Sequence, residues 1–344
     1  MASLWWLGHE VASLNVTHQV DGRRLAVKLD VARNDMAVDD GDAWPRPWMR
    51  HAAMAMLRCA CGKEWKPPKH VAFVMDGNRR HADAKRVKKE EGHRAGFQAL
   101  LRALGWCFEL GVRHVSAFAF AIDNFRRDPD EVSALMDLAE DKLVAIVEND
   151  VLAKHDVRVR VVGDLNLLPE KVRVAAMKAM KATEARKGAC LDVFLAYAAR
   201  DELAKAVENM RRDLARGQLE SEHVVEEELL KRMMNYGAPP VDLLVRTSGE
   251  RRLSDFLLAQ SVHAHLVFLD VLWPELSYWD LARAVLEHGM ASCREGEKSA
   301  RKMASCIHEQ FSSGYRTEHD HTLVREQATK TQKVQNVRYR EQTG

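Results

Sequence analysis

Three clusters of polar and charged residues follow directly after short apolar runs, and these clusters are the part of the sequence best suited to chemistry. The first begins with Asp76, Gly77 and Asn78 and continues into a dense group of cations. Those cations are Arg79, Arg80, Lys85, Arg86, Lys88, Lys89, His93 and Arg94. A carboxylate can bind Mg²⁺, a Gly-Asn turn exposes backbone N–H groups, and arginine binds phosphate oxygens bidentately. The cluster therefore fits a metal-bound diphosphate, and it fits equally well a strand-end turn before a solvated or RNA-binding basic face.

The second and third clusters are weak signals alone and stronger together. Residues 118–129 place Asn124 and Arg127 after an apolar run, and alone they favour a loop that caps a helix beginning near Pro129. Residues 241–256 carry three Arg and two Ser within nine residues, which suit a diphosphate bound without metal and also suit a surface salt-bridge patch. Three such clusters at strand ends of one sheet favour a shared phosphate site. Neither a Walker sequence nor Gly-x-Gly-x-x-Gly occurs, so a nucleotide-binding loop is not the source of the signal.

Short apolar runs bounded by Gly, Asp or Pro predict the six strands that would position these clusters. They are residues 70–76, 115–120, 157–164, 190–198, 241–247 and 263–270. Segments with apolar residues three and four positions apart predict helices. They are residues 97–110, 131–152, 169–186, 201–214, 226–234 and 278–288. The alternation predicts an α/β domain with a central, mostly parallel six-stranded sheet flanked by helices, and chemistry at the carboxyl ends of the strands.

The composition is that of an ordinary globular protein. Of the 344 residues, 47% are hydrophobic and 30% are charged, and the formal net charge is +2, so anion binding must come from local clusters. No uncharged apolar window approaches the length of a spanning helix, and the first residues lack the basic start and apolar core of a secretory signal. We therefore expect a protein made and kept on the cytosolic side. The six cysteines lack the spacing of a disulfide framework, and the Cys59/Cys61 pair lacks a second pair at zinc-ribbon spacing.

The pattern of apolar and polar residues divides the chain into three parts. Residues 1–66 have no sustained period and are expected to be an irregular leader. Residues 67–296 hold all the predicted strands and the three clusters, and are expected to form the working domain. Residues 297–344 are a polar tail, either a single surface helix or disordered.

Five segments together resemble the cis-prenyltransferases, the family of undecaprenyl and dehydrodolichyl diphosphate synthases. They are residues 70–80, 92–93, 120–127, 246–256 and 271–275, in the order and spacing of the family. The motifs Asp-Gly-Asn-Arg-Arg and Asp-Asn-Phe-Arg-Arg are similar to those of the eukaryotic, dolichol-making branch of the family. The resemblance covers roughly residues 67–296. It implies that the sheet and helices enclose a hydrophobic tunnel, that a dimer is the working unit, and that Mg²⁺ is the cofactor.

The resemblance also implies the reaction and the residues that carry it. Isopentenyl diphosphate units would be condensed onto an allylic diphosphate, farnesyl diphosphate, with cis geometry, giving a long-chain polyprenyl diphosphate for dolichol and glycosylation. Asp76 would bind Mg²⁺, and Asn124 would be catalytic by orienting the substrate, because an amide is a poor base. The allylic phosphates would be held by Gly77, Asn78, Arg79, Arg80 and His93. Isopentenyl diphosphate would be bound by Arg127, Arg246, Arg252 and Ser254. Further contacts to the substrates would come from His81, Lys89, Ala121, Ile122, Asp123, Phe125 and Leu253.

Four residues depart from the pattern of the family. Lys89 stands for the usual Arg and cannot replace its bidentate binding fully, Ala121 replaces a hydrogen-bonding Ser, and Asp123 shortens a Glu. His265 occupies the position of a metal-linked Glu of bacterial relatives, which the dolichol branch also lacks. Residues 294–296, Arg-Glu-Gly, fall where the family places an Arg-x-Gly that reaches into the partner's active site, but many further residues follow. Both a homodimer and a heterodimer with a Nogo-B-receptor-like subunit stay open.

Two other classes of function are weighed against the transferase. A non-catalytic accessory subunit of such a heteromer tends to lose the metal carboxylate and the basic residues, which this chain keeps. An RNA-binding module based on residues 85–89 would lack the exposed aromatic pattern of single-strand binders, so we expect no nucleic-acid partner. The family and its apolar product imply peripheral contact with the cytoplasmic face of the endoplasmic reticulum membrane.

Overall fold

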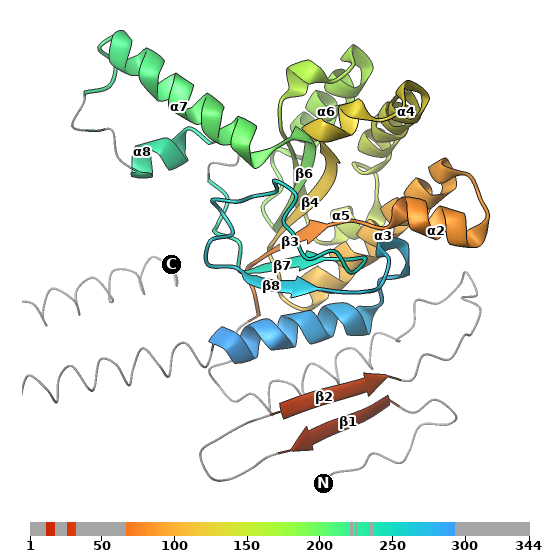
Figure 1. Cartoon of the computed structure of the whole chain (residues 1–344). Coiled ribbons are helices and arrows are strands. Elements are labelled where there is room, and N and C mark those ends of the chain that lie inside the picture. Colours follow the sequence, from red (N-terminus) through yellow and green to blue (C-terminus); the bar gives the residue numbers. More distant parts are fainter. Residues whose placement is uncertain are drawn as a thin grey trace, which may run out of the picture. The chain divides into compact units, whose positions relative to one another are not determined.

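The computed structural model describes residues 12–17, 26–31, 67–220, 223, 226–233 and 237–292 (Figure 1). The chain divides into two compact units, Met1–Ala291 and Ser292–Gly344, and the working parts described below belong to the first. Within the segment expected to be an irregular leader, β1 (Ala12–Thr17) and β2 (Ala26–Val31) pair antiparallel, which the sequence did not predict. None of the helices in the described part of the chain is long and apolar enough to cross a membrane.

The centre of the domain is a six-stranded sheet in which every neighbouring pair of strands is parallel. Its strands are β3 (His70–Val74), β4 (His114–Ala121), β5 (Val157–Val162), β6 (Ala189–Tyr197), β7 (Leu243–Arg246) and β8 (His265–Phe268). Their order in the sheet is β5-β6-β4-β3-β7-β8. All six predicted strands are confirmed, and "mostly parallel" becomes wholly parallel. The apolar runs with buried residues on both faces are the pattern that a covered parallel sheet requires.

Helices connect the strands. They are α2 (Asn78–Lys85), α3 (Lys89–Glu109), α4 (Pro129–Ala145), α5 (Asp150–Lys154), α6 (Glu170–Thr183), α7 (Ala199–Ala215), α8 (Glu226–Lys231) and a helix described over residues 278–292. Short 3₁₀ turns follow three of the strands: η1 (Ile122–Arg126), η2 (Leu165–Leu167) and η4 (Trp273–Glu275). In Figure 1, the arrows of β3, β7 and β8 point to the side of the sheet where α2 lies.

Two helix predictions need correction. The single helix predicted over residues 131–152 is broken into α4 and α5, because the Asn149 side chain accepts a hydrogen bond from the Val151 N–H at 3.0 Å and starts a new helix. The cation-rich segment after Asn78, for which no helix was predicted, forms α2, and α3 begins at Lys89 instead of residue 97. The other predicted helices are confirmed to within a few residues at their ends.

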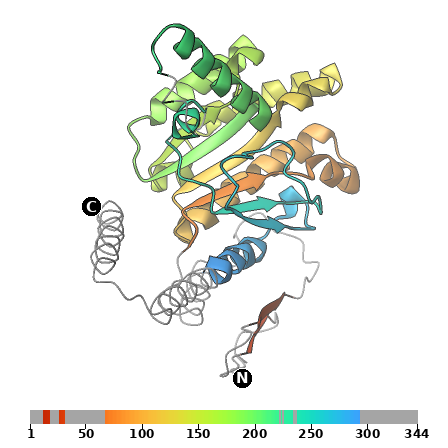
Figure 2. The same ribbon diagram turned by 60° about the vertical axis from the view of Figure 1, so that its left-hand side comes forward.

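Alternate residues along each strand pack into two separate cores, one on each face of the sheet. Val71 and Phe73 of β3 belong to the larger core, together with buried residues of α3, α4, α6 and the helix over 278–292. Ala72 and Val74 belong to the smaller core, which Phe256 completes. Both views show the blue helix over residues 278–292 beside the β8 end of the sheet (Figure 2). The sheet is therefore a rigid platform whose carboxyl edge carries the loops.

Candidate active site

The three polar clusters follow β3, β4 and β7, and these three strands are immediate neighbours in the sheet. The order β4-β3-β7 places residue Val74 beside both Phe118 and Arg246 in register. The loops that follow these strands therefore begin side by side at one edge. Sequence alone predicted that chemistry would gather at this edge, and the strand order confirms that the three clusters meet there.

The first and third clusters are joined by direct contacts between Asp76 and Arg246. Nη2 of Arg246 donates to Oδ2 of Asp76 at 2.9 Å, and Nη1 of Arg246 donates to Oγ of Ser254 at 2.6 Å and to the carbonyl of Arg252. Arg80 lies 4.0 Å from Oδ1 of Asp76 and donates to the carbonyl of Ser248 at 3.1 Å and to its hydroxyl. Asp76, Arg80, Arg246 and Ser254 therefore form one network built from segments about 170 residues apart.

The burial of this network differs sharply from one side chain to the next. The Arg246 side chain is 3% exposed and its Nε has no hydrogen-bond partner, whereas the Asp76 side chain is 36% exposed. Burial alone would raise the pKa of Asp76, but the hydrogen bond and charge of Arg246, the Gly77 N–H and the charge of Arg80 together lower it. Asp76 is therefore ionised at neutral pH.

Unusual backbone conformations shape the turns around Asp76. Gly77 has φ +108°, and a Cβ there would lie 2.9 Å from Leu272, so only glycine fits. Ser248 has φ +76° and Gly249 has φ +77°, so the turn after β7 also uses left-handed backbone. Thr247 ties the two turns together, since its hydroxyl donates to the Asp76 carbonyl at 2.7 Å. The positive φ values make tight turns at the strand ends, and the N–H groups of Ser248 and Gly249 donate to the carbonyls of Val271 and Leu269 at 2.8 Å.

Two glycines of α3 let the start of α2 lie against it. A Cβ at Gly96 would come within 2.3 Å of Oδ1 of Asn78, and a Cβ at Gly92 within 2.4 Å of the Asn78 carbonyl. Oδ1 of Asn78 is buried and has no hydrogen-bond partner. The glycine pair therefore fixes where the first turn of α2, with Arg79 and Arg80, can stand.

The second cluster meets the first through Glu131, a residue that the sequence reasoning missed. Its Oε1 accepts from Nη1 of Arg127 at 3.1 Å and lies 3.9 Å from Nη1 of Arg79, and its Oε2 accepts from Nζ of Lys89 at 3.3 Å. The one available signal in the sequence was the position of Glu131 four residues after Arg127 in a helix. The carboxylate gathers cations from three separate segments.

His93 lines a small cavity beside this carboxylate. The cavity has a volume of about 220 Å³, and its walls include Lys89, His93 and Glu131 on the polar side and Leu135 and Leu138 on the apolar side. Burial, reinforced by the charge of Arg127, lowers the pKa of His93 to about 4, and its Nε2 has no hydrogen-bond partner. His93 is therefore a neutral imidazole at pH 7, with one ring nitrogen available to a ligand.

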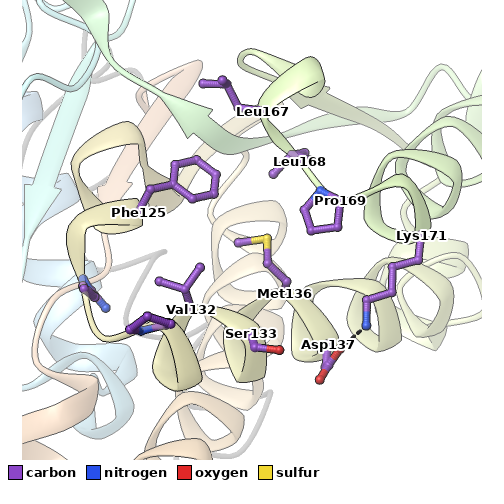
Figure 3. A pocket seen from close by; sticks show the side chains of 11 residues that line it. Phe125, Val132, Ser133, Met136, Asp137, Leu167, Leu168, Pro169 and Lys171 are labelled. Atoms are coloured by element: carbon purple, nitrogen blue, oxygen red, sulfur yellow. Dashed lines mark hydrogen bonds and ion pairs between the residues drawn. The ribbon is translucent and has the colours of Figure 1, made fainter.

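A larger cavity of about 570 Å³ has Arg127 in its lining. Figure 3 shows Phe125 of η1, Met136 of α4 and Pro169 around it, with the ion pair between Lys171 and Asp137 at its rim. Most of its wall is apolar. The larger cavity combines Arg127 and Lys171 with a mostly apolar wall, whereas the smaller one also carries the carboxyl groups of Glu90, Asp128, Asp130 and Glu131. The predicted hydrophobic tunnel stays a prediction.

Several predicted site residues take positions that limit what their side chains can do. Oδ1 of Asn124 accepts a hydrogen bond from the Ala121 N–H at 3.0 Å and so shapes η1, which also contains Ile122, Asp123 and Phe125. Asp123 is exposed and lies 3.5 Å from Arg126, whereas Phe125 packs edge-on against Phe120. His81 contacts Glu275 at 3.0 Å.

The Arg252 side chain is not brought into the network around Asp76. It is 64% exposed and donates to Glu250, and only its backbone carbonyl is held by Arg246. Leu253 packs against the smaller core. Of the third cluster, then, Arg246 and Ser254 contribute side chains to the network, and Arg252 stands at its exposed rim.

His265 lies at the opposite edge of the sheet. It is the first residue of β8 and pairs in register with Leu243, which in turn pairs with Val71, near the start of β3. Asp76 follows Val71 by five residues, a separation of roughly 16 Å along a strand. Within one chain His265 therefore cannot share a metal ion with Asp76. Residues 294–296 lie outside the described residues.

One other group of potential metal ligands lies on the described strands. His114, Cys190 and Asp192 have ligand atoms within 4.8 Å of one another. The Asp192 carboxylate is already used, because it accepts from Arg160 through two hydrogen bonds of 2.6 Å and contacts His114 at 2.6 Å. His114 and Cys190 form the first pair between β4 and β6, at the edge of the sheet away from Asp76. Thiol and imidazole ligands also do not suit Mg²⁺, so this cluster is a buried structural network.

Comparison with known proteins places the chain in a family. A sequence model of the prenyltransferase family described as "Putative undecaprenyl diphosphate synthase" matches residues 74–296. A dehydrodolichyl diphosphate synthase complex subunit of Mus musculus is 42% identical over 244 residues, which cover 70% of this chain and 73% of the relative. A tritrans,polycis-undecaprenyl-diphosphate synthase of Methanopyrus kandleri, named as geranylgeranyl-diphosphate specific, is 40% identical over 225 residues, which cover 65% and 83%.

A solved structure supports the same conclusion. Lavandulyl diphosphate synthase from Lavandula x intermedia, determined in complex with dimethylallyl diphosphate, superposes with a TM-score of 0.63 at 29% identity. The match covers 65% of this chain and 95% of that one. The family match over residues 74–296 spans the three clusters and five of the six strands of the sheet. The chain belongs to the undecaprenyl diphosphate synthase family of prenyltransferases.

Proposed function

We propose that this chain elongates an allylic diphosphate, farnesyl diphosphate, with isopentenyl diphosphate units in cis geometry and so makes a dehydrodolichyl-type polyprenyl diphosphate. The observation that carries the proposal is the network of Asp76, Arg80 and Arg246, in which an ionised, half-exposed carboxylate stands among cations from distant segments. A protein that only stabilised a partner would have no use for this arrangement. The identity to dehydrodolichyl and polycis-prenyl diphosphate synthases supports the same reaction.

The donor set at Asp76 fits Mg²⁺. A hard divalent cation takes oxygen ligands, and protein sites for Mg²⁺ commonly use one or two carboxylates together with substrate phosphates. Oδ2 of Asp76 is held by Arg246 and Oδ1 lies 4.0 Å from Arg80, so this half-exposed carboxylate can offer an oxygen to the ion. Bound there, Mg²⁺ would neutralise charge on the diphosphate that leaves the allylic carbon.

The residues of the chain have separate tasks in the reaction. The C–O bond of the allylic diphosphate breaks, the double bond of isopentenyl diphosphate attacks the allylic carbon, and loss of a proton fixes the new cis double bond. Arg79, Arg80 and the peptide groups of the Gly77 turn hold the departing diphosphate, and their fixed positive charge stabilises the transition state. Arg246 orients Asp76 and Ser254, and its unpartnered Nε can donate to a phosphate oxygen.

The second substrate is assigned to the other side of the site. Arg127 and the exposed Arg252 would bind isopentenyl diphosphate, and Asn124 would orient it through the η1 turn. His93, neutral at pH 7, would donate or accept a hydrogen bond at a phosphate oxygen. The apolar walls of the two cavities, with Leu135 and Met136 on opposite sides of α4, would receive the isoprenoid chains.

The experiment is elongation by pure protein with Mg²⁺ and labelled isopentenyl diphosphate. Farnesyl and geranylgeranyl diphosphate are supplied as alternative starters, each with and without a Nogo-B-receptor-like subunit, and the products are measured by mass spectrometry. We expect long cis-polyprenyl diphosphates, lost in the variant Asp76→Ala. If complexes with wild type and Asp76→Ala elongate equally, the chain is an accessory subunit and the proposal is wrong. Activity of the chain alone would indicate a homodimer. Binding to vesicles and cell fractionation test the proposed peripheral contact with the endoplasmic reticulum membrane.

A further inference from the structure

Glu131 is the acidic side chain that contacts cations of both the first and the second cluster. Glu90, Asp128 and Asp130 also line the cavity beside it, but no ion pair with Arg79, Lys89 or Arg127 is described for them. The Glu131 carboxylate is 11% exposed and contacts Arg127 at 3.1 Å, Lys89 at 3.3 Å and Arg79 at 3.9 Å. These cations come from α2, from the first residue of α3 and from the end of η1. All three are residues that would bind diphosphates in the proposed function.

The charge of Glu131 is fixed by these neighbours. Burial would raise the pKa of its carboxyl, but the Lys89 hydrogen bond and the charges of Arg127 and Arg79 together lower it. The cations in turn disfavour one another, since burial and the charge of Arg79 lower the pKa of Arg127. At neutral pH an anion therefore stands among cations that would otherwise repel each other. It stabilises their assembly when no substrate is present, and it repels any diphosphate that binds beside it.

The space for such a diphosphate lies next to the carboxylate. Glu131, Lys89 and His93 all line the cavity of about 220 Å³, and Nε2 of His93 has no partner there. An anion in this cavity would compete with Glu131 for Lys89, whereas Arg79 and Arg127 contact Glu131 without lining the cavity. Each condensation leaves one pyrophosphate, which must depart before the next isopentenyl diphosphate is used.

We propose that Glu131 is a positioning residue that acts as an internal counter-anion: it holds Arg79, Lys89 and Arg127 together between reactions and reclaims them as pyrophosphate departs. This inference rests on the proposed function. Removing the negative charge while keeping the side-chain length should leave the cations without their competitor. Pyrophosphate should then bind more tightly and leave more slowly, whereas a residue that only supported the fold would weaken binding when replaced.

The test measures pyrophosphate affinity by titration calorimetry in the presence of Mg²⁺, with wild type, Glu131→Gln and Glu131→Asp. We expect about three- to tenfold tighter binding for Glu131→Gln, since a unit charge a few ångströms from a partly screened anion is removed. Glu131→Asp keeps the charge and should stay within about twofold of wild type. Glu140→Gln is the matched control, because Glu140 lies on the same helix and contacts only the exposed Lys171 among the ion pairs described.

Kinetics provide a second readout. For Glu131→Gln we expect stronger product inhibition by pyrophosphate and a lower kcat, without a rise in the KM for isopentenyl diphosphate. Should Glu131→Gln not fold, Glu131→Met is a second uncharged variant with the same expected direction. Unchanged or weaker pyrophosphate binding in the folded uncharged variant would overturn the inference while leaving the proposed function intact. Failure of wild type both to bind pyrophosphate and to elongate would instead overturn the proposed function itself.

Discussion

The variant Asp76→Asn separates the stabilising role of the Asp76 carboxylate from its role in the reaction. The substitution keeps the shape of the side chain and one oxygen that can accept a hydrogen bond, but it removes the negative charge opposite Arg246. The Arg246 side chain is 3% exposed, so in the variant a buried cation would be left with only neutral partners, the Ser254 hydroxyl and the Arg252 carbonyl.

The expected loss of stability follows from this geometry. A hydrogen bond to a charged group contributes about 1.5–3 kcal/mol. Because the Asp76 side chain is 36% exposed and the asparagine oxygen can still accept, solvent and the remaining bond offset part of that loss. We expect the free energy of unfolding to fall by about 1–2 kcal/mol at pH 7, less than the roughly 3–5 kcal/mol for breaking a fully buried pair. Elongation should fall by at least about 10²-fold, the cost of removing one well-placed electrostatic group.

The difference in stability should depend on pH in a defined direction. The pKa of Asp76 is lowered below its ordinary value of 3.8, so the folded state binds its proton less readily than the unfolded state. The contribution of the ionised carboxylate is therefore complete above pH 3.8 and is lost as the pH falls through the lower folded value. The two proteins should differ fully at pH 7 and 5, and the difference should shrink as the pH falls below 3.8.

Urea unfolding at pH 7, 5, 4 and 3, with the elongation assay at pH 7, measures both effects. The control is Asp83→Asn, an exposed acid on the same helix as Arg80, for which we expect a change within about 0.5 kcal/mol and normal elongation. Equal stability of wild type and Asp76→Asn at pH 7 would refute the reasoning about the Arg246 pair. Full elongation by Asp76→Asn would refute the assignment of Asp76 to Mg²⁺.

Two further substitutions and one titration test the scaffold. Gly96→Ala should destabilise the protein by about 1–3 kcal/mol and reduce elongation, because its Cβ would lie 2.3 Å from Oδ1 of Asn78. The control is Gly105→Ala on the same helix, whose Cβ would lie 3.8 Å from the nearest atom, Cγ1 of Val151, and which should be neutral or stabilising. Thermal unfolding measures the stability of both variants. Asp192→Asn should cost about 3–5 kcal/mol, because it removes the charge of the buried carboxylate that accepts two hydrogen bonds from the Arg160 guanidinium. The exposed Asp137→Asn should cost under about 1 kcal/mol, and urea unfolding measures both. His70, buried with a pKa lowered to about 4, should stay neutral in NMR titrations until about that pH, and the free energy of unfolding should fall by about 3 kcal/mol as the pH drops from 6.5 to 4. An NMR midpoint near 6.5 would contradict this burial argument.

The sequence determined the parts of the molecule that depend on local pattern. Six apolar runs were enough to predict six strands, because a covered parallel strand needs continuous apolar residues over a short length. The same locality placed Asp76, the η1 segment and Arg246 at strand ends. The family motifs over residues 70–80 and 246–256 then indicated a diphosphate-binding prenyltransferase, which the comparisons confirm.

Tertiary structure decided everything that depends on partners distant in the sequence. The order β4-β3-β7 brings Asp76 to Arg246 across 170 positions, and no local pattern encodes that pairing. In the sequence Glu131 is an ordinary residue of a predicted helix, and only the folded structure brings Arg79 and Lys89 into contact with it. His265 aligned with a metal-linked position in the sequence, yet the parallel register places it at the far edge of the sheet. The apolar pattern of a strand determines which of its residues are buried. Which charged side chains contact one another depends on the packing of the whole sheet, because these contacts form only when segments distant in the sequence lie at the same edge.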